Sequence, residues 1–166
     1  MVIVLGVDGR YAFSVMPVDV KTEILIDRPV AQLATYTNDP DNVPTWHVDI
    51  KTMEWQTEPP VALGSKCAFV AHFLGNRMAY VYEVVEYDPL GGLTMRTAEG
   101  PFPMETTYAY QSIGPTPPRV RWRNRGEPAG FLKLVAPFMA LAMRRANNKD
   151  LALLKQTIEA LPPDAS

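Results

Sequence analysis

The stretch Ala129–Leu161, AGFLKLVAPFMALAMRRANNKDLALLKQTIEAL, has the pattern of one long helix near the end of the chain. A helix on a protein surface normally carries one apolar stripe. The second half of this helix shows such a stripe, but the first half is apolar on more than one side, with Phe131, Leu132, Leu134, Val135, Phe138, Met139, Leu141, Ala142 and Met143. We expect the second half to pack on a sheet, and the first half to cover a container for an apolar molecule.

Two features qualify this expectation. Pro137 lies inside the helical pattern and removes one backbone hydrogen bond, so a kink or a split is expected there. A filled core would explain the apolar first half nearly as well as a container does. The helix alone therefore leaves both interpretations open.

Seven segments with the pattern of strands precede the helix. Residues 18–27 alternate apolar and polar side chains, which is typical of a half-buried strand. Two short helical segments follow, at 29–37 and 40–46, because Pro29 and Pro40 each fit the first turn of a helix. The six later strands are bounded by glycine, proline and asparagine turns and lie at about residues 49–55, 66–74, 77–87, 93–98, 103–113 and 119–125. Such short connections predict an antiparallel sheet whose strands follow one another in sequence.

Length and composition exclude several classes of protein. A chain of 166 residues with 47% hydrophobic and 20% charged residues fits one globular domain. The net charge of −2 gives no field that would attract nucleic acid. No apolar run reaches the roughly 18 residues of a membrane span. The single cysteine, Cys67, excludes an internal disulfide and favours a cytoplasmic location.

The domain boundaries follow from the same patterns. We expect residues 1–15 to be a poorly ordered N-terminal extension, because the pattern from Val18 onward is complete without them. The alternative is a hairpin that turns at Asp8-Gly9. Residues 16–161 are predicted to form one domain, followed by a tail at 162–166. The sequence predicts a monomer or a homodimer without choosing between them.

Several phrases of the sequence resemble a known family, the START-like superfamily, in its polyketide cyclase/dehydrase and lipid-transport branch. The order of the predicted elements is similar, and so are NDPDNVPTWH at 38–47, GSK at 64–66, FLGNR at 73–77, YEVVEYDP at 82–89 and DLALLK at 150–155. The resemblance covers roughly residues 18–160. It implies an α+β helix-grip fold, in which a curved antiparallel sheet of about seven strands wraps around a long C-terminal helix, with two short helices after the first strand. It also implies an apolar cavity for a lipid, polyketide or aromatic molecule, and it carries no catalytic residue over, because the superfamily shares no catalytic motif.

The candidate ligand-binding residues are aromatic, methionine, valine and asparagine side chains on the strands and the helix. An empty apolar void of about 300 Å³ would cost roughly 7 kcal/mol, so a real pocket must be partly polar and wet, or filled. Buried tyrosine hydroxyls need polar partners, and methionine adapts to several ligand shapes. The alternative for each residue is a place in a simple core. The candidates are Trp46, Phe69, Phe73, Tyr80, Tyr82, Met95, Met104, Tyr108, Trp122, Asn124, Phe131, Val135, Phe138 and Met139.

The histidines and the cysteine do not predict a metal site. His47, His72 and Cys67 are too few and too scattered for a structural zinc site, which needs four ligands. Strand parity places His72 away from the cavity. His47 follows the second short helix and is a weaker candidate for the rim of the pocket. No other cofactor is expected, because no phosphate loop or dinucleotide motif is present.

Four arginines alternate along the last strand, at 119, 121, 123 and 125, so they share one face of the sheet. We expect a solvated outer face paired with acidic residues, with Trp122 and Asn124 pointing inward. The alternative is a site for an anionic partner. Among the strand acids, Glu105 should point outward, and Glu86 would point inward unless a bulge reverses the strand.

Three functions remain open: binding of an apolar molecule, a polyketide cyclase or dehydratase, and an interaction module with a filled core. In the enzyme, Tyr80, Tyr108, Asn124 or Glu86 would orient or protonate the substrate. The cavity discriminates between the three functions. No void favours the interaction module, a purely apolar pocket favours binding, and a pocket in which a carboxylate or histidine meets a tyrosine or asparagine favours the enzyme.

Overall fold

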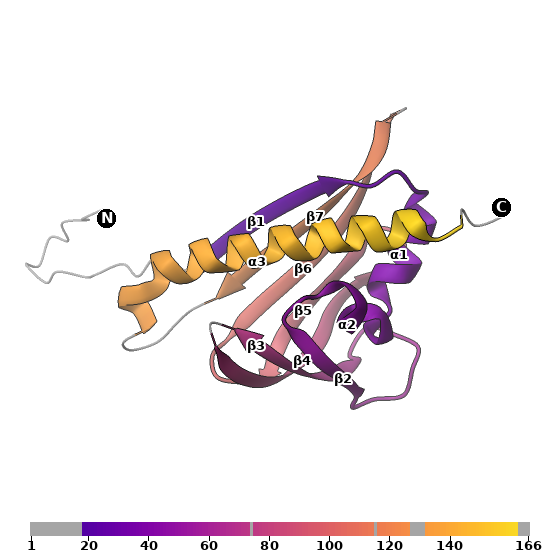
Figure 1. The fold of residues 1–166 in the computed structure, drawn as a ribbon. Helices are drawn as coiled ribbons and strands as arrows, with labels where there is room; N and C mark the ends of the chain where they lie inside the picture. Colours follow the sequence, from indigo (N-terminus) through magenta and orange to yellow (C-terminus); the bar gives the residue numbers. More distant parts are fainter. Residues whose placement is uncertain (1–17, 74, 115, 127–131, 163–166) are drawn as a thin grey trace, which may run out of the picture.

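The computed structural model describes residues 18–73, 75–114, 116–126 and 132–162. Seven strands form one sheet in the order β1-β7-β6-β5-β4-β3-β2. The strands are β1 (Val18–Leu25), β2 (Ile50–Trp55), β3 (Lys66–Phe73), β4 (Asn76–Asp88), β5 (Gly92–Glu99), β6 (Met104–Ile113) and β7 (Thr116–Gly126). All neighbouring pairs are antiparallel, and the sheet curves around one long helix (Figure 1). The predicted α+β helix-grip architecture is confirmed.

The first and last strands lie side by side. Val18 pairs with Gly126 and Leu25 with Arg119, so β1 joins the sheet through residues about a hundred positions away. The other neighbours are successive hairpins, as the short turns predict. The pairing of β1 with β7 gives the long helix, α3 (Leu132–Ala160), a wide concave face to lie on.

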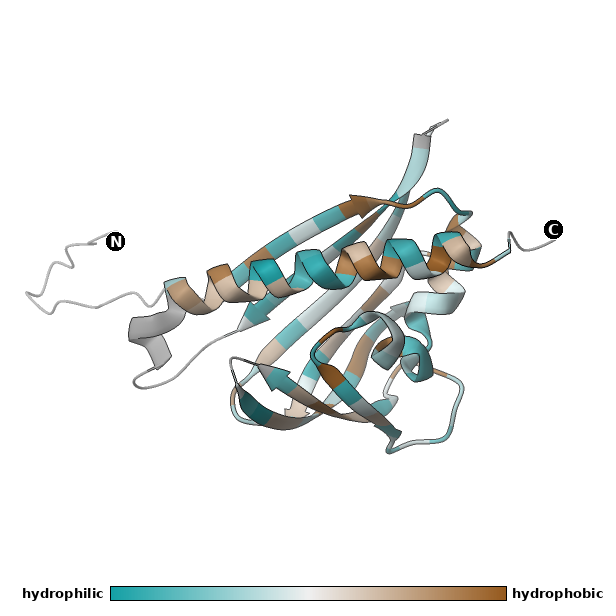
Figure 2. Ribbon diagram, in the orientation of Figure 1, coloured by the Kyte–Doolittle hydropathy of each residue, from teal (hydrophilic) through white to brown (hydrophobic). Residues whose placement is uncertain are grey.

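Helix α3 runs across the concave face of the sheet from one end to the other (Figure 1). Of the expected kink or split at Pro137, the split does not occur, because α3 is one continuous helix, and its first turn lies at an angle to the rest. Figure 2 shows apolar residues in both halves, separated by a hydrophilic stretch. That stretch corresponds to RRANNKD at 144–150.

Helix α1 (Val30–Asn38), the 3₁₀ turn η1 (Pro40–Asn42) and helix α2 (Val43–Trp46) cover one end of the sheet. Asp39 caps η1, because its carboxylate accepts a hydrogen bond from the Asp41 amide at 3.0 Å. Helix α2 contacts α3 and brings Trp46 into the core, where it is fully buried. The residue after it, His47, is thereby placed beneath α3.

The outer face of the sheet carries ion pairs. Arg123 binds Asp19, Arg119 and Arg121 both reach Glu23, and Arg125 reaches Glu105. These partners agree with the expected solvated outer face. The position of Glu86 differs from the inward direction that strand parity predicts. The register shifts between Val84 and Glu86, so the Glu86 side chain is exposed and accepts a hydrogen bond from Thr94. An extra residue in one strand reverses which side chains point inward.

Candidate functional site

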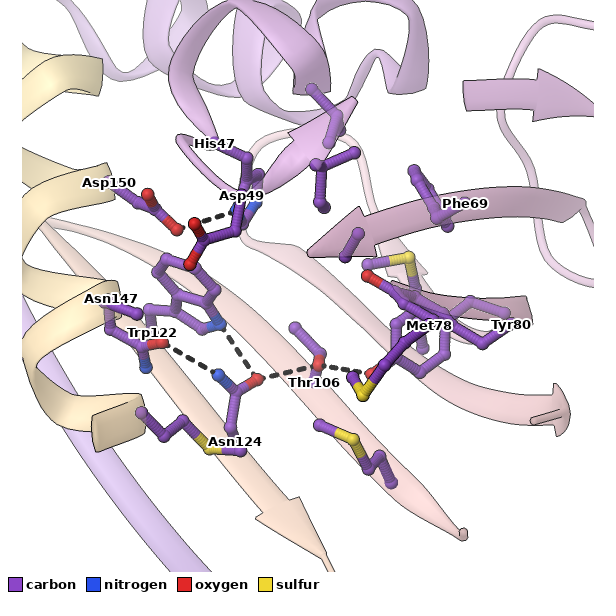
Figure 3. A pocket seen from close by; sticks show the side chains of 18 of the residues that line it. His47, Asp49, Phe69, Met78, Tyr80, Thr106, Trp122, Asn124, Asn147 and Asp150 are labelled. Atoms are coloured by element: carbon purple, nitrogen blue, oxygen red, sulfur yellow. Dashed lines mark hydrogen bonds and ion pairs between the residues drawn. The ribbon is translucent and has the colours of Figure 1, made fainter. Parts of the chain in front are cut away.

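A cavity of about 140 Å³ lies between the concave face of the sheet, the end of α2 and helix α3 (Figure 3). Most of its lining is apolar. Strands β2 to β7 supply one wall, and α3 supplies the other through Met139, Met143, Ala146, Asn147 and Asp150. From the helix, only short or flexible side chains face this space.

Nine of the residues proposed from the sequence line this cavity: Phe69, Tyr80, Tyr82, Met95, Met104, Tyr108, Trp122, Asn124 and Met139. Two others lie elsewhere. Trp46 is fully buried behind the cavity, with its ring 3.9 Å from that of His47, and Phe138 is 74% exposed on the far side of α3. Phe131 and the side chains of Phe73 and Val135 lie outside the described residues. The period of α3 explains Phe138, which is one position away from Met139 and so points to a different side.

The histidine at the cavity joins a carboxylate to a tyrosine. His47 Nδ1 lies 2.9 Å from Asp150 Oδ2, and its Nε2 lies 3.1 Å from the Tyr108 hydroxyl. The second oxygen of Asp150 accepts the Val48 amide at 2.9 Å. A carboxylate can only accept, so Nδ1 carries the proton and Nε2 of the neutral ring accepts from Tyr108. All three side chains are buried.

A second chain of polar groups runs along the sheet. Tyr82 contacts Thr106 at 3.2 Å, Thr106 donates to Asn124 Oδ1 at 2.7 Å, and Trp122 Nε1 donates to the same oxygen at 3.0 Å. The Asn124 amide then donates to Asn147 Oδ1 at 3.2 Å. Figure 3 shows this chain running from Asn147 on α3 through Asn124 to Thr106 on the sheet. The cavity therefore has a polar end and an apolar end.

Burial controls the acidity of the tyrosines. Loss of solvent raises the pKa of Tyr108 well above its ordinary value of 10.0, and it raises the pKa values of Tyr80 and Tyr82 as well. A buried phenolate would be poorly solvated, so the neutral phenol is the stable form. At neutral pH these tyrosines are therefore neutral phenols that form hydrogen bonds, and they are not ionised as phenolates.

The charges on the cavity wall have one sign. Asp49 and Asp150 line it, whereas no lysine or arginine does so among the described residues. Figure 3 shows the Asp49 side chain among those that line the cavity. In the described part of the chain, no group of three or more histidine, cysteine or acidic residues is placed to hold a metal ion. The polar part of the wall thus consists of hydrogen-bonding and acidic side chains.

The sequence reasoning missed part of the polar end. Asn147, Asp150, Thr106 and Asp49 line the cavity but were not among the candidates. A signal for the first two was present, because residues three or four positions apart share a face of a helix. Met139, Met143, Asn147 and Asp150 follow one another at this spacing, so they share one face of α3. Thr106 shares the parity of Tyr108 on β6, whereas nothing in the pattern marks Asp49.

Comparison with known proteins agrees with this fold. Residues 17–159 match the model of the family described as polyketide cyclase / dehydrase and lipid transport. The chain belongs to that family. No curated protein matches it in sequence. Among the described residues, no helix combines the length and apolar character needed to cross a membrane.

Solved structures show the same fold at low sequence identity. Protein TTHA0849 from Thermus thermophilus is 18% identical, with a TM-score of 0.74 over 86% of this chain and 97% of that one. A START superfamily protein from Mycobacterium smegmatis is 13% identical, with a TM-score of 0.72 over 87% and 99% of the two chains. The Zhui aromatase/cyclase from a Streptomyces species is 15% identical, with a TM-score of 0.70 over 87% and 94%. At these identities the likeness shows the fold alone.

Proposed function

We propose that this protein binds a small, largely apolar molecule in the cavity between the sheet and α3. The observation that carries the proposal is a cavity of about 140 Å³ whose apolar wall ends in a polar network. A filled interaction module would have no such space. An apolar pocket with a few placed polar groups is the usual form of a small-molecule site.

The volume limits the ligand. An engineered cavity of about 150 Å³ binds benzene, so the present space suits one ring or a short chain. A molecule with several fused rings would need the first half of α3 to move. Ligands of a lipid or polyketide type therefore fit only as small members of their class, or with part of the molecule outside the cavity.

A cavity-filling variant tests this function. Ala146 lines the cavity on α3, so Ala146→Phe places a ring in the space, whereas Ala152→Phe adds the same ring on an exposed side of the same helix. Ligand-observed NMR with acetophenone, a neutral single-ring probe, should show binding to the wild type and to Ala152→Phe, and at least tenfold weaker binding to Ala146→Phe. Equal binding by all three would place the ligand elsewhere. Native mass spectrometry of the purified protein would then identify a co-purifying ligand.

A second function, that of a cyclase or dehydratase, meets the criterion stated from the sequence: a histidine held by a carboxylate meets a tyrosine on the cavity wall. Asp150 orients His47 so that the Nε2 atom of His47 accepts a hydrogen bond from the Tyr108 hydroxyl. A bound molecule could give a proton to the Tyr108 oxygen as Tyr108 passes its own proton to His47. The resulting imidazolium would lie beside the Asp150 carboxylate, which stabilises it. Removal of a proton next to a carbonyl is the step that a cyclase or dehydratase requires.

The enzyme function has its own test. In D₂O, the wild type should speed the exchange of the methyl protons of acetophenone for deuterium above the rate in buffer. Tyr108→Phe and His47→Gln should lower that exchange at least tenfold while acetophenone still binds. Exchange at the buffer rate in the wild type would remove this function and leave the binding function standing.

A further inference from the structure

The polar end of the cavity contains a buried amide nitrogen that makes no hydrogen bond within the described residues. Asn147 is only 3% exposed, it lines the cavity, and its Nδ2 makes no hydrogen bond in the described part of the chain. A buried donor without a partner is costly, and native structures usually satisfy it with protein, water or ligand. Among the buried unpaired atoms of the described residues, it alone belongs to a residue on this cavity wall.

The orientation of the Asn147 amide is fixed by its neighbours. An indole nitrogen can only donate, so the atom of Asn124 that Trp122 Nε1 approaches at 3.0 Å must be the amide oxygen. The other end of that amide is then Nδ2, and it approaches Asn147 at 3.2 Å. Asn147 therefore presents its oxygen to Asn124. Its own Nδ2 is the end that remains unpaired.

The hydroxyls of Thr106, Tyr82 and Tyr108 have no proton to spare. Thr106 uses its proton on Asn124, so Tyr82 must donate to Thr106. Tyr108 donates to His47 Nε2 when the ring is neutral. A ligand that enters here therefore meets amide donors, of which Asn147 Nδ2 makes no hydrogen bond in the described part of the chain.

The charge of the wall adds a second condition. Asp49 and Asp150 face the cavity, and no lysine or arginine among the described residues lines it. Even with His47 protonated, the lining keeps a net negative charge. A carboxylate ligand would lose its hydration and lie near like charges, both of which disfavour it.

Building on the proposed binding function, we propose that the cavity selects neutral single-ring molecules that carry a hydrogen-bond acceptor such as a carbonyl, held by Asn147 Nδ2, and that it excludes carboxylates such as fatty acids. The acceptor end of the ligand lies at the polar end of the cavity. The ring lies among Phe69, Met95 and Met104.

Three probes of similar size separate these conditions: acetophenone has an acceptor, ethylbenzene has none, and benzoate is an anion at pH 8. The variant Asn147→Leu removes the donor, and Asn148→Leu makes the same change at the exposed neighbouring position. The ratio of the dissociation constants for acetophenone and ethylbenzene should rise about fivefold in Asn147→Leu, as expected for one net hydrogen bond. It should stay unchanged in Asn148→Leu. Benzoate should bind the wild type at least tenfold more weakly than acetophenone, and Asp49→Asn should strengthen its binding.

Each outcome has a defined meaning. If the wild type binds none of the probes, the proposed function fails and this inference fails with it. If acetophenone and ethylbenzene bind but Asn147→Leu leaves their ratio unchanged, or if benzoate binds as well as acetophenone, only this inference is overturned. If Asn147→Leu does not fold, the ¹⁵N side-chain amide signal of Asn147 in the wild type decides. It should move with acetophenone and not with ethylbenzene, and equal behaviour would overturn the proposal.

Discussion

The two halves of α3 lie on the same sheet and meet it in different ways. In the second half, Leu151, Leu154 and Ile158 are almost completely buried and pack into the core. In the first half, Met139 and Met143 face a cavity, while Phe138 and Leu141 are exposed. Both halves are rich in apolar residues, so apolar content by itself does not tell a packed helix from a cavity wall.

This contrast shows which half of α3 contributes more to the free energy of unfolding. Close packing of branched side chains stabilises the second half. The first half is packed less closely, because it lines the cavity. The polar residues Asn147 and Asp150 lie at the border between the two halves. The following predictions test that division.

The largest effect is expected in the packed half. Leu154→Ala should lower the free energy of unfolding by about 2–5 kcal/mol, because it leaves a cavity in a fully buried position. Phe138→Ala removes a larger side chain from the first half, but it should change stability by only about 0.5 kcal/mol, since Phe138 is 74% exposed. Urea unfolding measures both. Comparable losses would contradict the division of the helix.

A smaller loss is expected at the border. Asp150→Asn should lower the free energy of unfolding by about 1–3 kcal/mol, because each carboxylate oxygen accepts a hydrogen bond and the amide has only one acceptor. The exposed neighbour offers a control: Lys149→Gln also removes a charge and should have little effect. A neutral result for Asp150→Asn in urea unfolding would mean that the His47–Asp150 pair does not anchor α2 to α3.

Alkaline pH tests whether the buried cysteine and tyrosines on the inner face of the sheet are shielded from water. Burial raises the pKa of Cys67 from 9.0 to about 11, and it raises the pKa values of Tyr80, Tyr82 and Tyr108 above 10.0. The unfolded chain releases these protons first, so stability is complete below pH 9 and falls as the pH rises from there. Urea unfolding between pH 8 and 10.5 should show the decline, and Cys67→Ala should flatten its first part. Tyrosine absorbance that titrates fully near pH 10 in the folded protein would show a wet cavity.

The smallest effect is expected on the opposite face of the sheet. Replacing Arg121 and Arg123 with Gln should leave acetophenone binding unchanged, because their pairs with Glu23 and Asp19 lie outside. Surface ion pairs of this kind contribute about 0–1 kcal/mol to stability. Isothermal titration measures the binding. A large loss would contradict the assignment of inner and outer faces and place part of the ligand site there.

Much of the fold follows from local patterns in the sequence. The alternation of Arg121, Trp122 and Arg123 predicts both faces of β7, and the turns predict the successive hairpins. Simple parity points Glu86 inward, but a bulge after Val84 shifts the register, and no residue pattern marks where a bulge lies. The candidate site was predicted where strand parity is regular. His47 was a candidate for the rim, but its pairing with Asp150 was not predicted, because that contact joins residues 103 positions apart.

Local periodicity and turn chemistry are enough to specify the elements of this protein, their order and the inward aromatic residues. The contacts of His47 arise only on folding, because they join it to Asp150 across 103 positions and to Tyr108 across 61. The same holds for Asn147 Nδ2, which has no partner in the described part of the chain, and for the space of about 140 Å³ beside it. A cavity and its unpaired donor depend on how the curved sheet and the helix fit together, and that fit is a property of many distant residues at once.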